Sequence, residues 1–306
     1  MKQATVGFCG LGAMGYPMAA RLAARGHALT VFDLDAARME RFASEHGAAT
    51  AAAAAGLAHC GTVITMVPDS AAVEQAVLGD AAVPGFAHAM PPDSVVLDMS
   101  SSDPLRTRAL ARRLAGMGLH LVDAPVSGGV KRAVSGQLAI MAGGGPEVIE
   151  RCRPLLECMG SSLFVVGAAG AGHAVKALNN FVSAAGLVAT VEALRAGEAF
   201  GLDPKVVTDV FNASTGRNNT TENKVTQFML PGAYNSGFSL KLMRKDIRTA
   251  LELGRALGLD MTLGAACLRL WDAAGERDGA ADHTEMYRLI PELETLADPP
   301  AGTGRK

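Results

Sequence analysis

A glycine-rich turn near the N-terminus constrains the fold of this chain more than any other feature. The apolar run ATVGFC at 4–9 precedes the turn, and an alanine-rich segment from about residue 14 to 25 follows it. A second apolar run, ALTVF at 28–32, closes at Asp33. A strand, a tight turn, a helix and a second strand make a βαβ unit, so we expect a parallel sheet to begin here.

The turn has the glycine spacing of a dinucleotide-binding loop. We expect all six of its residues to line a cofactor: Gly10, Leu11, Gly12, Ala13, Met14 and Gly15. The first glycine permits the tight turn, the second lets a pyrophosphate approach the backbone, and the third lets the helix pack closely on the strand. The helix N-terminus then offers free N–H groups and a positive dipole end to the phosphates.

Asp33 stands where an acidic residue can accept hydrogen bonds from the ribose hydroxyls of a dinucleotide. A carboxylate there favours NAD over NADP, because it would repel a 2′-phosphate. Arg38 follows a few residues later, so NADP use stays open. The alternative is an ordinary glycine-rich turn, with Asp33 as a solvated residue at the end of a strand.

Strands and helices continue to alternate up to residue 166. We expect further strands at 62–67, 94–99, 119–124, 137–144 and 163–166, and helices at 35–46, 50–58, 70–78 and 146–158. This pattern predicts an α/β Rossmann-type domain over residues 1–166.

Beyond Gly167 we find no convincing strand, and helical periodicity dominates. We expect helices at 172–200, 204–213, 222–229, 239–257, 261–275 and 282–296. The second half is therefore expected to be an all-α domain over 167–297, built on the long helix between Gly170 and Gly201. We expect the tail at 298–306 to be disordered.

Composition and charge narrow the functional classes. A net charge of -2 gives no broad electrostatic case for nucleic acid or an anionic membrane as partner. The five cysteines are widely spaced without a CxxC pair, which favours free thiols in a reducing cytoplasm over disulfides or a metal site. No uninterrupted apolar run of about 20 residues suggests a membrane span. We therefore expect a cytoplasmic protein with a small-molecule partner.

Two polar segments follow expected strands where ligands of such sheets bind. Val67 and Pro68 end the strand at 62–67, and Ser100, Ser101 and Ser102 follow the strand at 94–99. We expect Val67, Pro68 and Ser101 to line the cofactor. Capping of the next helix by Ser102 or Asp103 is the alternative for this cluster.

A third segment, Ser127, Gly128 and Gly129, follows the strand at 119–124. A Ser-Gly-Gly turn exposes backbone N–H groups and one hydroxyl, and such a nest can hold a carboxylate. An ordinary turn is the alternative.

The long helix carries one lysine, Lys176, near its start, and Asn179 and Asn180 share its face one turn later. A lysine and two amides at the head of an otherwise apolar helix suggest chemistry. A lysine that snorkels from the helix end is the alternative. Another group of cations, including Lys245, precedes Asp246 at a later helix start.

Together these segments resemble the β-hydroxyacid dehydrogenase family, which includes 3-hydroxyisobutyrate dehydrogenase and tartronate semialdehyde reductase. The matching segments are GFCGLGAMGYPMA at 7–19, DMSSSDP at 98–104, DAPVSGG at 123–129, GHAVKALNN at 172–180 and FSLKLMRKD at 238–246. The resemblance spans nearly the whole chain. It departs at Arg21, where Asn or His is usual, and at Ser101, where Thr is usual and the hydroxyl is kept.

The resemblance implies a role for each matching residue. Lys176 would be the catalytic residue, with Asn180 beside the reacting hydroxyl. The turn at 127–129 would hold the substrate carboxylate. Lys245 would line the cleft for cofactor and substrate, and Asp246 would help to position it. The resemblance also implies a Rossmann domain, a helical domain on a long connecting helix, and a homodimer or homotetramer.

The chemistry of the residues agrees with that role for Lys176. Hydride transfer between an alcohol and NAD requires a group that removes or delivers the hydroxyl proton. His173 is the only histidine in the motifs, and we read it as structural. To accept a proton Lys176 must be neutral, so we expect its pKa to be lowered by burial and by nearby cations such as Lys245.

A polar run, NASTGRNNTTENK at 212–224, separates two apolar helices. We expect Arg217 in this run to contact an anionic or polyhydroxy end of the substrate. A solvated loop with Thr or Asn helix caps is the alternative.

These features predict an NAD-preferring oxidoreductase that acts on a small, 3-hydroxyisobutyrate-like 3-hydroxy acid or on the matching semialdehyde. A tartronate- or succinic-type semialdehyde reductase remains open. So does an oxidative decarboxylase like 6-phosphogluconate dehydrogenase, although the chain is short for one. Imine reductases usually lack the lysine. The alternative outside enzymes is a dinucleotide-sensing binding protein.

Overall fold

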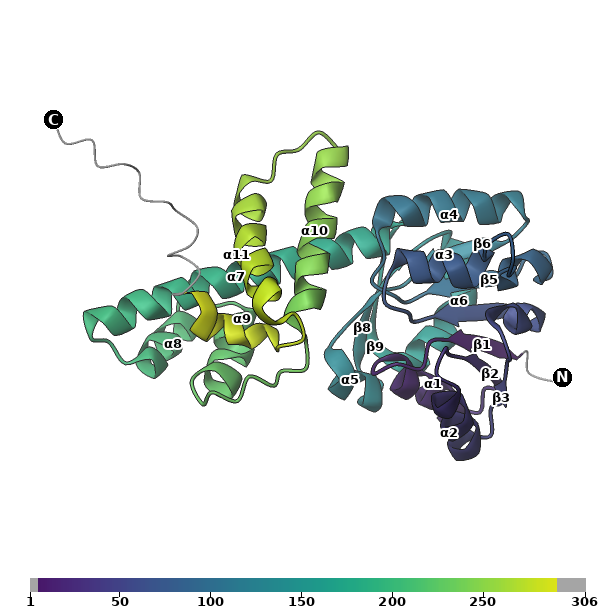
Figure 1. Ribbon diagram of the computed structural model, residues 1–306, viewed down its shortest axis with the longest axis horizontal. Helices are drawn as coiled ribbons and strands as arrows, with labels where there is room; N and C mark the ends of the chain where they lie inside the picture. The colour runs from purple at the N-terminus through teal and green to yellow at the C-terminus, as the bar shows by residue number, and fades with distance from the viewer. Residues whose placement is uncertain (1–4, 291–306) are drawn as a thin grey trace. The chain divides into compact units, whose positions relative to one another are not determined.

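The computed structural model of the protein describes residues 5–290. The chain forms two compact units that divide between Lys176 and Ala177, here called unit 1 and unit 2 (Figure 1). The tail at 298–306, which the sequence predicts to be disordered, lies outside the described residues.

Unit 1 is built around a nine-stranded sheet with the order β3-β2-β1-β4-β5-β6-β8-β7, in which β9 also pairs with β8. The strands are β1 Val6–Cys9, β2 Leu29–Phe32, β3 Ala49–Thr50, β4 Thr62–Thr65, β5 Val95–Asp98, β6 His120–Asp123, β7 Val126–Ser127, β8 Leu138–Gly143 and β9 Gly160–Gly167. The helices of unit 1 are α1 Gly15–Ala24, α2 Ala36–His46, η1 Ala54–His59, α3 Ser70–Leu78, η2 Phe86–Ala89, α4 Pro104–Gly116, α5 Gly129–Ser135 and α6 Pro146–Met159.

The register of the parallel strands brings their carboxyl ends into one row. Cys9 at the end of β1 pairs with Phe32 and Thr65, the last residues of β2 and β4. Asp98 at the end of β5 pairs with Thr65 and with Asp123, the last residue of β6. The polar segments that follow these strands therefore start from the same edge of the sheet.

Side chains of the central strands alternate between two cores, because successive residues of a strand point to opposite faces. Phe8, Ile64 and Leu97 pack in one core with residues of α1, α2 and α6. Val63 and Val96 pack in the other with residues of η1, α3 and α4. Helices therefore cover both faces of the sheet, and the predicted α/β Rossmann-type fold is confirmed (Figure 1).

The far side of the sheet departs from the parallel arrangement. β8 runs antiparallel to β6 and β7, and β9 runs parallel to β8. The strands predicted at 137–144 and 163–166 are thus present, with β9 longer than expected.

The helix predicted at 50–58 is wrong. Ala49–Thr50 instead form β3 beside β2, and a 3-10 helix, η1, follows. Ala51 continues this pairing, since its N–H donates to the carbonyl of Val31 at 2.9 Å. Pairing with the sheet edge removes the first residues from the alanine-rich run, so the helix propensity of alanine is overridden.

Unit 2 is helical over its described residues, where an isolated bridge between Ser239 and Asp282 is the only β-type pairing. Its helices are α7 Ala171–Phe200, which begins in unit 1, α8 Pro204–Ala213, α9 Asn219–Asn223, the π-helix η3 Val225–Met229, α10 Leu240–Ala256, α11 Thr262–Asp278 and the 3-10 helix η4 His283–Glu285. A core around the fully buried Trp271 joins residues of α7, α10 and α11.

Two predicted helices of unit 2 differ from the structure. The single helix expected at 222–229 is two elements, because a capping box at Asn218 starts α9 earlier and Lys224 then ends it. The helix expected at 282–296 begins as the 3-10 turn η4, capped by Asp282. Residues 286–290 continue as α-helix, and the remainder of the prediction lies outside the described residues.

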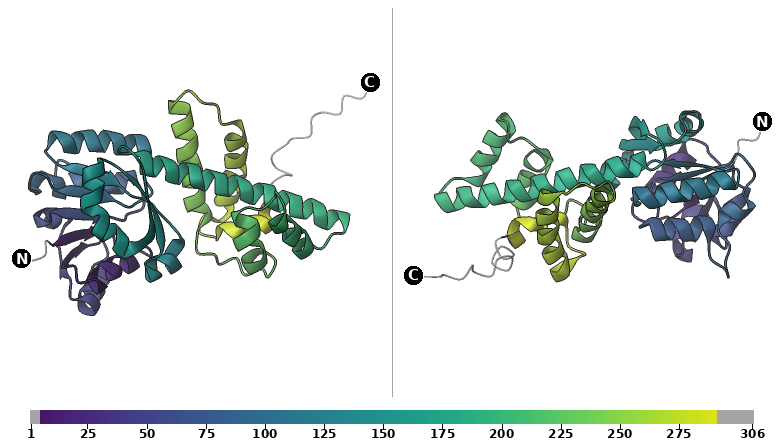
Figure 2. Two further views of the ribbon diagram at one scale, coloured as in Figure 1. Left: turned by 180° about the vertical axis from the view of Figure 1, so that it is seen from behind. Right: turned by 90° about the horizontal axis from the view of Figure 1, so that it is seen from above.

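The long predicted helix is present as α7, one continuous helix of 30 residues (Figure 2). By length and composition alone it could cross a membrane, a test that the core helix of a soluble protein also passes. Its most apolar window is 44% buried inside the structure. The buried residues Leu187, Val191 and Leu194 belong to the core of unit 2, which explains much of this hydrophobicity without a membrane.

A methyl group should affect stability differently at two glycines of the first turn. A Cβ at Gly15 would lie 1.9 Å from the carbonyl oxygen of Gly10, whereas a Cβ at Gly12 would have no heavy atom within 4 Å. We expect Gly15→Ala to lower the free energy of unfolding by about 1–3 kcal/mol. Gly12→Ala should change it by less than about 0.5 kcal/mol. Urea denaturation of both variants measures this, and equal stabilities would contradict the close packing at Gly15.

Candidate functional site

The glycine turn leaves an open space beside the start of α1. Gly10 has a φ of 101°, and a Cβ there would lie 2.3 Å from the carbonyl oxygen of Met66, so the turn passes directly over the end of β4. Gly12, in contrast, faces open space. No side chain caps α1, and its first turn holds no acidic residue. The open face and the uncapped, positive helix end suit the pyrophosphate of a dinucleotide.

Asp33 closes the other side of this turn. Its carboxylate accepts the N–H of Leu11 at 2.6 Å and the N–H of Asp35 at 2.9 Å. The guanidinium of Arg38 lies 3.8 Å from the same carboxylate, and the Asp33 side chain keeps 11% of its surface exposed. The carboxylate is therefore fixed next to the turn with one edge open, a position that suits a ribose ligand.

The serines that follow β5 make different contacts. Ser100 is fully buried, and its hydroxyl accepts the N–H of Val67 at 3.0 Å. Ser102 donates to the carboxylate of Asp98 at 2.9 Å. The cap of α4 is Asp103, which accepts the N–H groups of Leu105 and Arg106. Helix capping therefore falls to Asp103, and the predicted roles of Ser101, Val67 and Pro68 toward a cofactor remain predictions.

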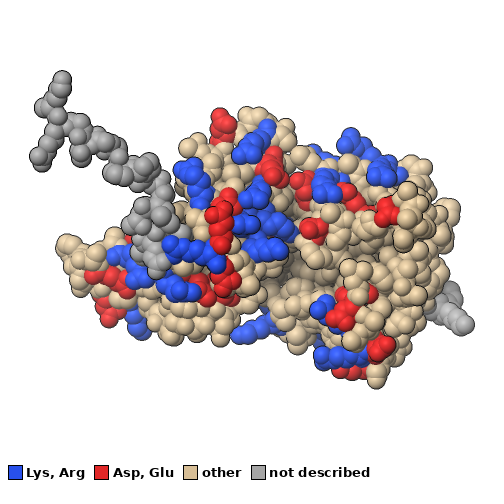
Figure 3. Space-filling view, in the orientation of Figure 1, with Lys and Arg blue, Asp and Glu red and all other residues tan. Residues whose placement is uncertain are grey.

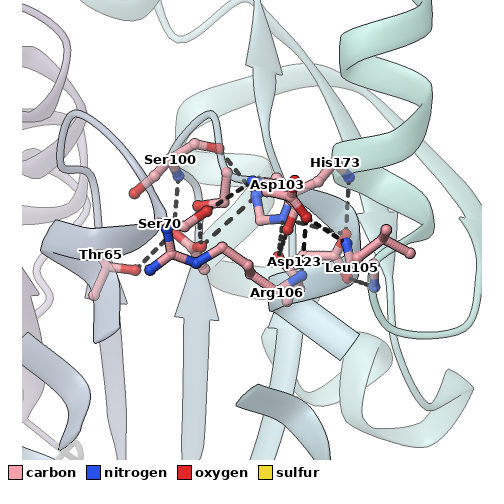
Figure 4. Close-up of polar contacts among 12 residues, drawn as sticks. Thr65, Ser70, Ser100, Asp103, Leu105, Arg106, Asp123 and His173 are labelled. Atoms are coloured by element: carbon pink, nitrogen blue, oxygen red, sulfur yellow. Dashed lines mark hydrogen bonds and ion pairs between the residues drawn. The ribbon is translucent and has the colours of Figure 1, made fainter. Parts of the chain in front are cut away.

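Two carboxylates and an imidazole meet in the interior below this cluster (Figure 4). His173, at the start of α7, shares hydrogen bonds of 2.9 Å with the Thr107 hydroxyl and 3.0 Å with the Ser100 carbonyl. Its two ring nitrogens lie 3.7 Å from the carboxylates of Asp98 and Asp123. All three ionisable side chains are essentially without solvent contact. His173 is thus engaged on both nitrogens, as expected of the structural role that we predicted.

Asp123 ties the first turn of α7 to the sheet. Its carboxylate accepts the N–H of Gly170 at 2.6 Å and the N–H of His173 at 2.9 Å. Burial raises the pKa of Asp123, while His173 and these two N–H donors act in the opposite direction. Three residues after His173 the same helix carries Lys176, so this cluster fixes the part of α7 that presents the lysine.

The Ser-Gly-Gly segment is a turn with two glycines at positive φ, and its predicted role as a carboxylate nest remains a prediction. Ser127 ends β7, and Gly128 and Gly129 have φ values of 133° and 67°, which side-chain-bearing residues rarely adopt. Gly128 and Gly129 are exposed, and α5 begins here without a side-chain cap or an acidic residue in its first turn. Backbone N–H groups at this point suit a carboxylate.

Lys176 and Asn180, on successive turns of α7, are both buried, with 8% and 6% of their surfaces exposed. In unit 2 the side-chain amide of Asn180 donates to Asp246 at 2.6 Å, and the ammonium of Lys245 lies 3.4 Å from the same carboxylate. The structure thus brings together three of the predicted residues, and Asp246 fixes the orientation of the Asn180 amide.

Further cations surround this point on α10. Figure 3 shows Lys and Arg side chains gathered over α10 and α11, with acidic side chains beside them. Arg244 and Arg248 both approach Asp272, at 3.5 and 2.8 Å. The overall charge of the chain conceals this local basic region.

The polar run at 212–224 is partly structural. Asn218 caps α9 through its side chain, as the alternative reading predicted. Arg217 is 63% exposed and pairs with Glu222 at 3.2 Å. The predicted contact of Arg217 with a substrate remains a prediction.

Sequence reasoning missed the burial of Lys224. This residue ends α9 with 8% of its surface exposed, and its ammonium donates to Ser183 of α7 at 3.4 Å. Burial lowers the pKa of Lys224 to about 8, while Asp282 opposes the shift. The sequence held one weak signal, since Lys224 is followed directly by the apolar stretch VTQFML.

Comparison with known proteins now identifies the class. A family model described as the NAD binding domain of 6-phosphogluconate dehydrogenase matches residues 5–167. Another, described as NAD-binding of NADP-dependent 3-hydroxyisobutyrate dehydrogenase, matches residues 170–290. Fold, glycine turn and matches together define an NAD(P)-dependent oxidoreductase.

Individual relatives extend over nearly the whole chain. It is 34% identical to 2-(hydroxymethyl)glutarate dehydrogenase of Eubacterium barkeri over 295 residues, which cover 96% of each protein. It is 35% identical to NAD-dependent L-serine dehydrogenase of Pseudomonas aeruginosa, over 89% of this chain and 91% of that protein. The structure of Mycobacterium tuberculosis 3-hydroxyisobutyrate dehydrogenase with L-serine is similar at a TM-score of 0.86 and 31% identity, over 94% of this chain and 99% of that one.

The chain belongs to the β-hydroxyacid dehydrogenase family, and its cofactor is NAD(P). The resemblance seen in the sequence motifs is thereby confirmed.

Asp33 and Arg38 predict how the chain discriminates between the two dinucleotides. We expect Asp33→Ala to weaken NAD binding, because the acceptor beside the turn is lost. NADP should be affected less, because the carboxylate that would repel a 2′-phosphate is removed, while Arg38, which also pairs with Asp35 at 3.1 Å, keeps its positive charge near that position. The ratio of the two dissociation constants should move by about 10- to 100-fold, the worth of a charged hydrogen bond. Fluorescence titration with NADH and NADPH measures it, with Asp33→Ala/Arg38→Ala as the control that removes the NADP gain. An unchanged ratio of the two dissociation constants would show that Asp33 does not contact the ribose.

The buried Lys224 should make the stability of the protein depend on pH. A pKa lowered from 10.5 to about 8 means that the folded protein binds fewer protons than the unfolded chain between those values, so stability rises with pH across that window. Below about pH 8 the buried ammonium lowers the free energy of unfolding by its full amount, about 3 kcal/mol at 1.36 kcal/mol per pKa unit. Asp282 faces this lysine, and His283 beside it is neutral at pH 7 because burial lowers its pKa to about 4.

The variant Lys224→Met removes the charge and keeps an unbranched apolar chain. We expect it to be more stable than the parent at pH 7 and to lose most of that advantage by pH 10. Urea denaturation at the two pH values measures the difference. The same gain at both values would show that the ammonium carries no burial penalty.

Proposed function

We propose that this protein is an NAD-preferring dehydrogenase that transfers a hydride between a small 3-hydroxy acid and its semialdehyde, with Lys176 as general acid and base. The observation that carries the proposal is the burial of Lys176 on α7, one turn before an Asn180 amide that Asp246 holds in place. Hydroxyacid oxidation with NAD(P) is the reaction class of the family to which the chain belongs.

The names of the relatives support a substrate class. 2-(Hydroxymethyl)glutarate, L-serine and 3-hydroxyisobutyrate share one skeleton, a carboxylate whose neighbouring carbon bears a hydroxymethyl group. They differ only in the second substituent of that carbon. The substrate of this chain should share this skeleton, with the hydroxymethyl carbon as the reacting centre.

Lys176 would handle the proton of the reaction. The bound nicotinamide accepts the hydride from the alcohol carbon, or returns it to the aldehyde. A neutral lysine removes the hydroxyl proton in the oxidative direction, and an ammonium polarises and then protonates the aldehyde oxygen in the reductive one. Lys176 is suited to this role because only 8% of its surface is exposed.

The other predicted residues would bind and orient the substrate and the cofactor. The backbone N–H groups at Ser127, Gly128 and Gly129 would hold the substrate carboxylate. Asn180, oriented by Asp246, would donate to or accept from the reacting hydroxyl, and Lys245 would line the cofactor and substrate. Ser101, Val67 and Pro68 would border the nicotinamide side.

The organisation of the molecule is part of the proposal. The functional domain boundary would fall between 166 and 167, close to the ends of the matched family models at 167 and 170. A homodimer or homotetramer would form through the helical domain, since Phe200 of α7 is 84% exposed and Val206 and Val210 of α8 are also exposed. A cytoplasmic location would suit five buried cysteines that form no disulfide.

The test of this function is Lys176→Ala, assayed with 3-hydroxyisobutyrate, L-serine and 2-(hydroxymethyl)glutarate. We expect turnover to fall by about 10²- to 10⁴-fold, the usual contribution of a general acid or base. NAD affinity, measured by titration, should stay within a few fold. Lys205→Ala on exposed α8 is the matched control. Near-normal turnover of Lys176→Ala would show that Lys176 is not the general acid and base. Release of CO2 together with NADH would instead favour the oxidative decarboxylase.

A further inference from the structure

A pocket of about 140 Å³ lies within unit 2, beside the face of α7 that carries the amides. Asn179, Val182, Ser183 and Gly186 line it from α7, and Asn218 and Asn219 line it from the start of α9. The volume admits a group of several non-hydrogen atoms. Four of these six residues offer a hydroxyl or an amide, so the lining can bind a polar group beside the apolar side chain of Val182.

Lys224 supplies a positive charge directly behind this lining. Its ammonium lies 3.4 Å from the hydroxyl of Ser183, which is one of the lining residues. Among the described residues no carboxylate lies within 4 Å of this ammonium. Asp282 is the acidic neighbour, and its oxygens are occupied by Ser236, Thr284 and the N–H of Gly237. A buried cation without a carboxylate partner attracts an anion strongly.

A second observation comes from buried polar atoms around Lys224. The hydroxyl of Thr220, which follows the lining residue Asn219, has no hydrogen-bond partner, and neither does Nε2 of His283. Both residues are more than 95% buried. Buried polar atoms are normally paired, so two unpaired ones near Lys224 point to a ligand or to water.

The pocket continues the face of α7 that starts at the proposed catalytic lysine. Lys176, Asn179 or Asn180, and Ser183 follow one another at spacings of three and four residues, and such residues share one face of a helix. Lys176 and Ser183 are two turns apart, about 10 Å along the axis. A five-carbon acid together with two long side chains can span that length.

We propose that this pocket, with Lys224 behind Ser183, binds a carboxylate at the far end of the second substituent of the substrate, so that the preferred substrates are dicarboxylic 3-hydroxy acids. The inference rests on the proposed function, and it selects among substrates that share the hydroxymethyl and carboxylate skeleton. Lys224 would be a specificity residue that contacts the substituent and takes no part in the hydride step. Arg217, exposed and paired with Glu222, is the rival cation for the same carboxylate.

The test compares 2-(hydroxymethyl)glutarate with its 5-amide, which keeps the shape and removes the far charge. We expect the parent protein with NAD to prefer the dicarboxylate by about 10- to 100-fold in kcat/KM, the usual worth of a hydrogen bond to a charged group. Lys224→Met should bring that ratio to within about threefold while the kcat with 3-hydroxyisobutyrate is kept. Lys205→Met, an exposed lysine of α8, should leave the ratio unchanged.

A second variant tests the pocket by shape. A Cβ at Gly186 would lie 3.9 Å from Asn218, so added carbon narrows the pocket without a clash. Gly186→Val should raise the KM for 2-(hydroxymethyl)glutarate and leave that for 3-hydroxyisobutyrate within about twofold. Equal effects on both substrates would place the substituent elsewhere.

A binding measurement separates failure of this inference from failure of the proposed function. Glutarate and its monoamide are titrated calorimetrically into the parent, Lys224→Met and Arg217→Ala, each saturated with NAD. Tighter binding of glutarate that is lost in Lys224→Met supports the pocket even if neither hydroxy acid is turned over. Equal binding of acid and amide, or a preference lost only in Arg217→Ala, would overturn it.

Discussion

The buried contact between Asp123 and the first turn of α7 is the interaction on which the arrangement of the site depends. A carboxylate without solvent contact must have its oxygens satisfied, and here Gly170 and His173 supply two backbone N–H donors. Asp98 and the imidazole of His173 complete a group that joins the ends of β5 and β6 to α4 and α7. Breaking such a group leaves an uncompensated buried charge, so the helix start has little freedom to shift. Lys176 inherits that fixed position because it lies one turn further along the same helix.

Close backbone packing makes this contact possible. A Cβ at Gly172 would lie 2.3 Å from the carbonyl oxygen of Met141, and one at Gly143 would lie 2.8 Å from the backbone N of Gly172. Glycine at these two positions lets α7 begin directly on the sheet. The same device appears at Gly10 and Gly15, where the first turn and α1 approach β4 and each other. Glycine therefore permits close backbone contacts at two places in unit 1, at the dinucleotide turn and at the start of α7.

Unit 2 holds a different kind of feature, a cation that weakens the fold. Burial lowers the pKa of Lys224, and this lysine faces the hydroxyl of Ser183 and the carboxylate of Asp282, whose oxygens already accept other hydrogen bonds. Residues that reduce stability are common at functional sites, because binding needs groups whose partner is the ligand. The π-helix that starts directly after Lys224 is a second irregularity of the type often found at such sites. Specificity in this proposal therefore resides in unit 2, whereas the glycine turn and Asp33 reside in unit 1.

The sequence by itself determined the class of the fold, the dinucleotide turn, the family and the helix that carries Lys176. These conclusions rest on local patterns: the periodicity of apolar residues, the spacing of glycines and the order of the motifs. Such patterns can be recognised without knowing which distant segments are in contact. Only the tertiary structure decided that residues 49–50 join the sheet edge, that Asn218 starts α9, and that Asp98, Asp123 and His173 form one buried group. It also decided that Lys224 is the buried cation of the polar run while Arg217 is exposed. The reason is physical: burial and pairing depend on which distant segments pack together, and a lysine in a polar run has the same letters whether it faces solvent or a core.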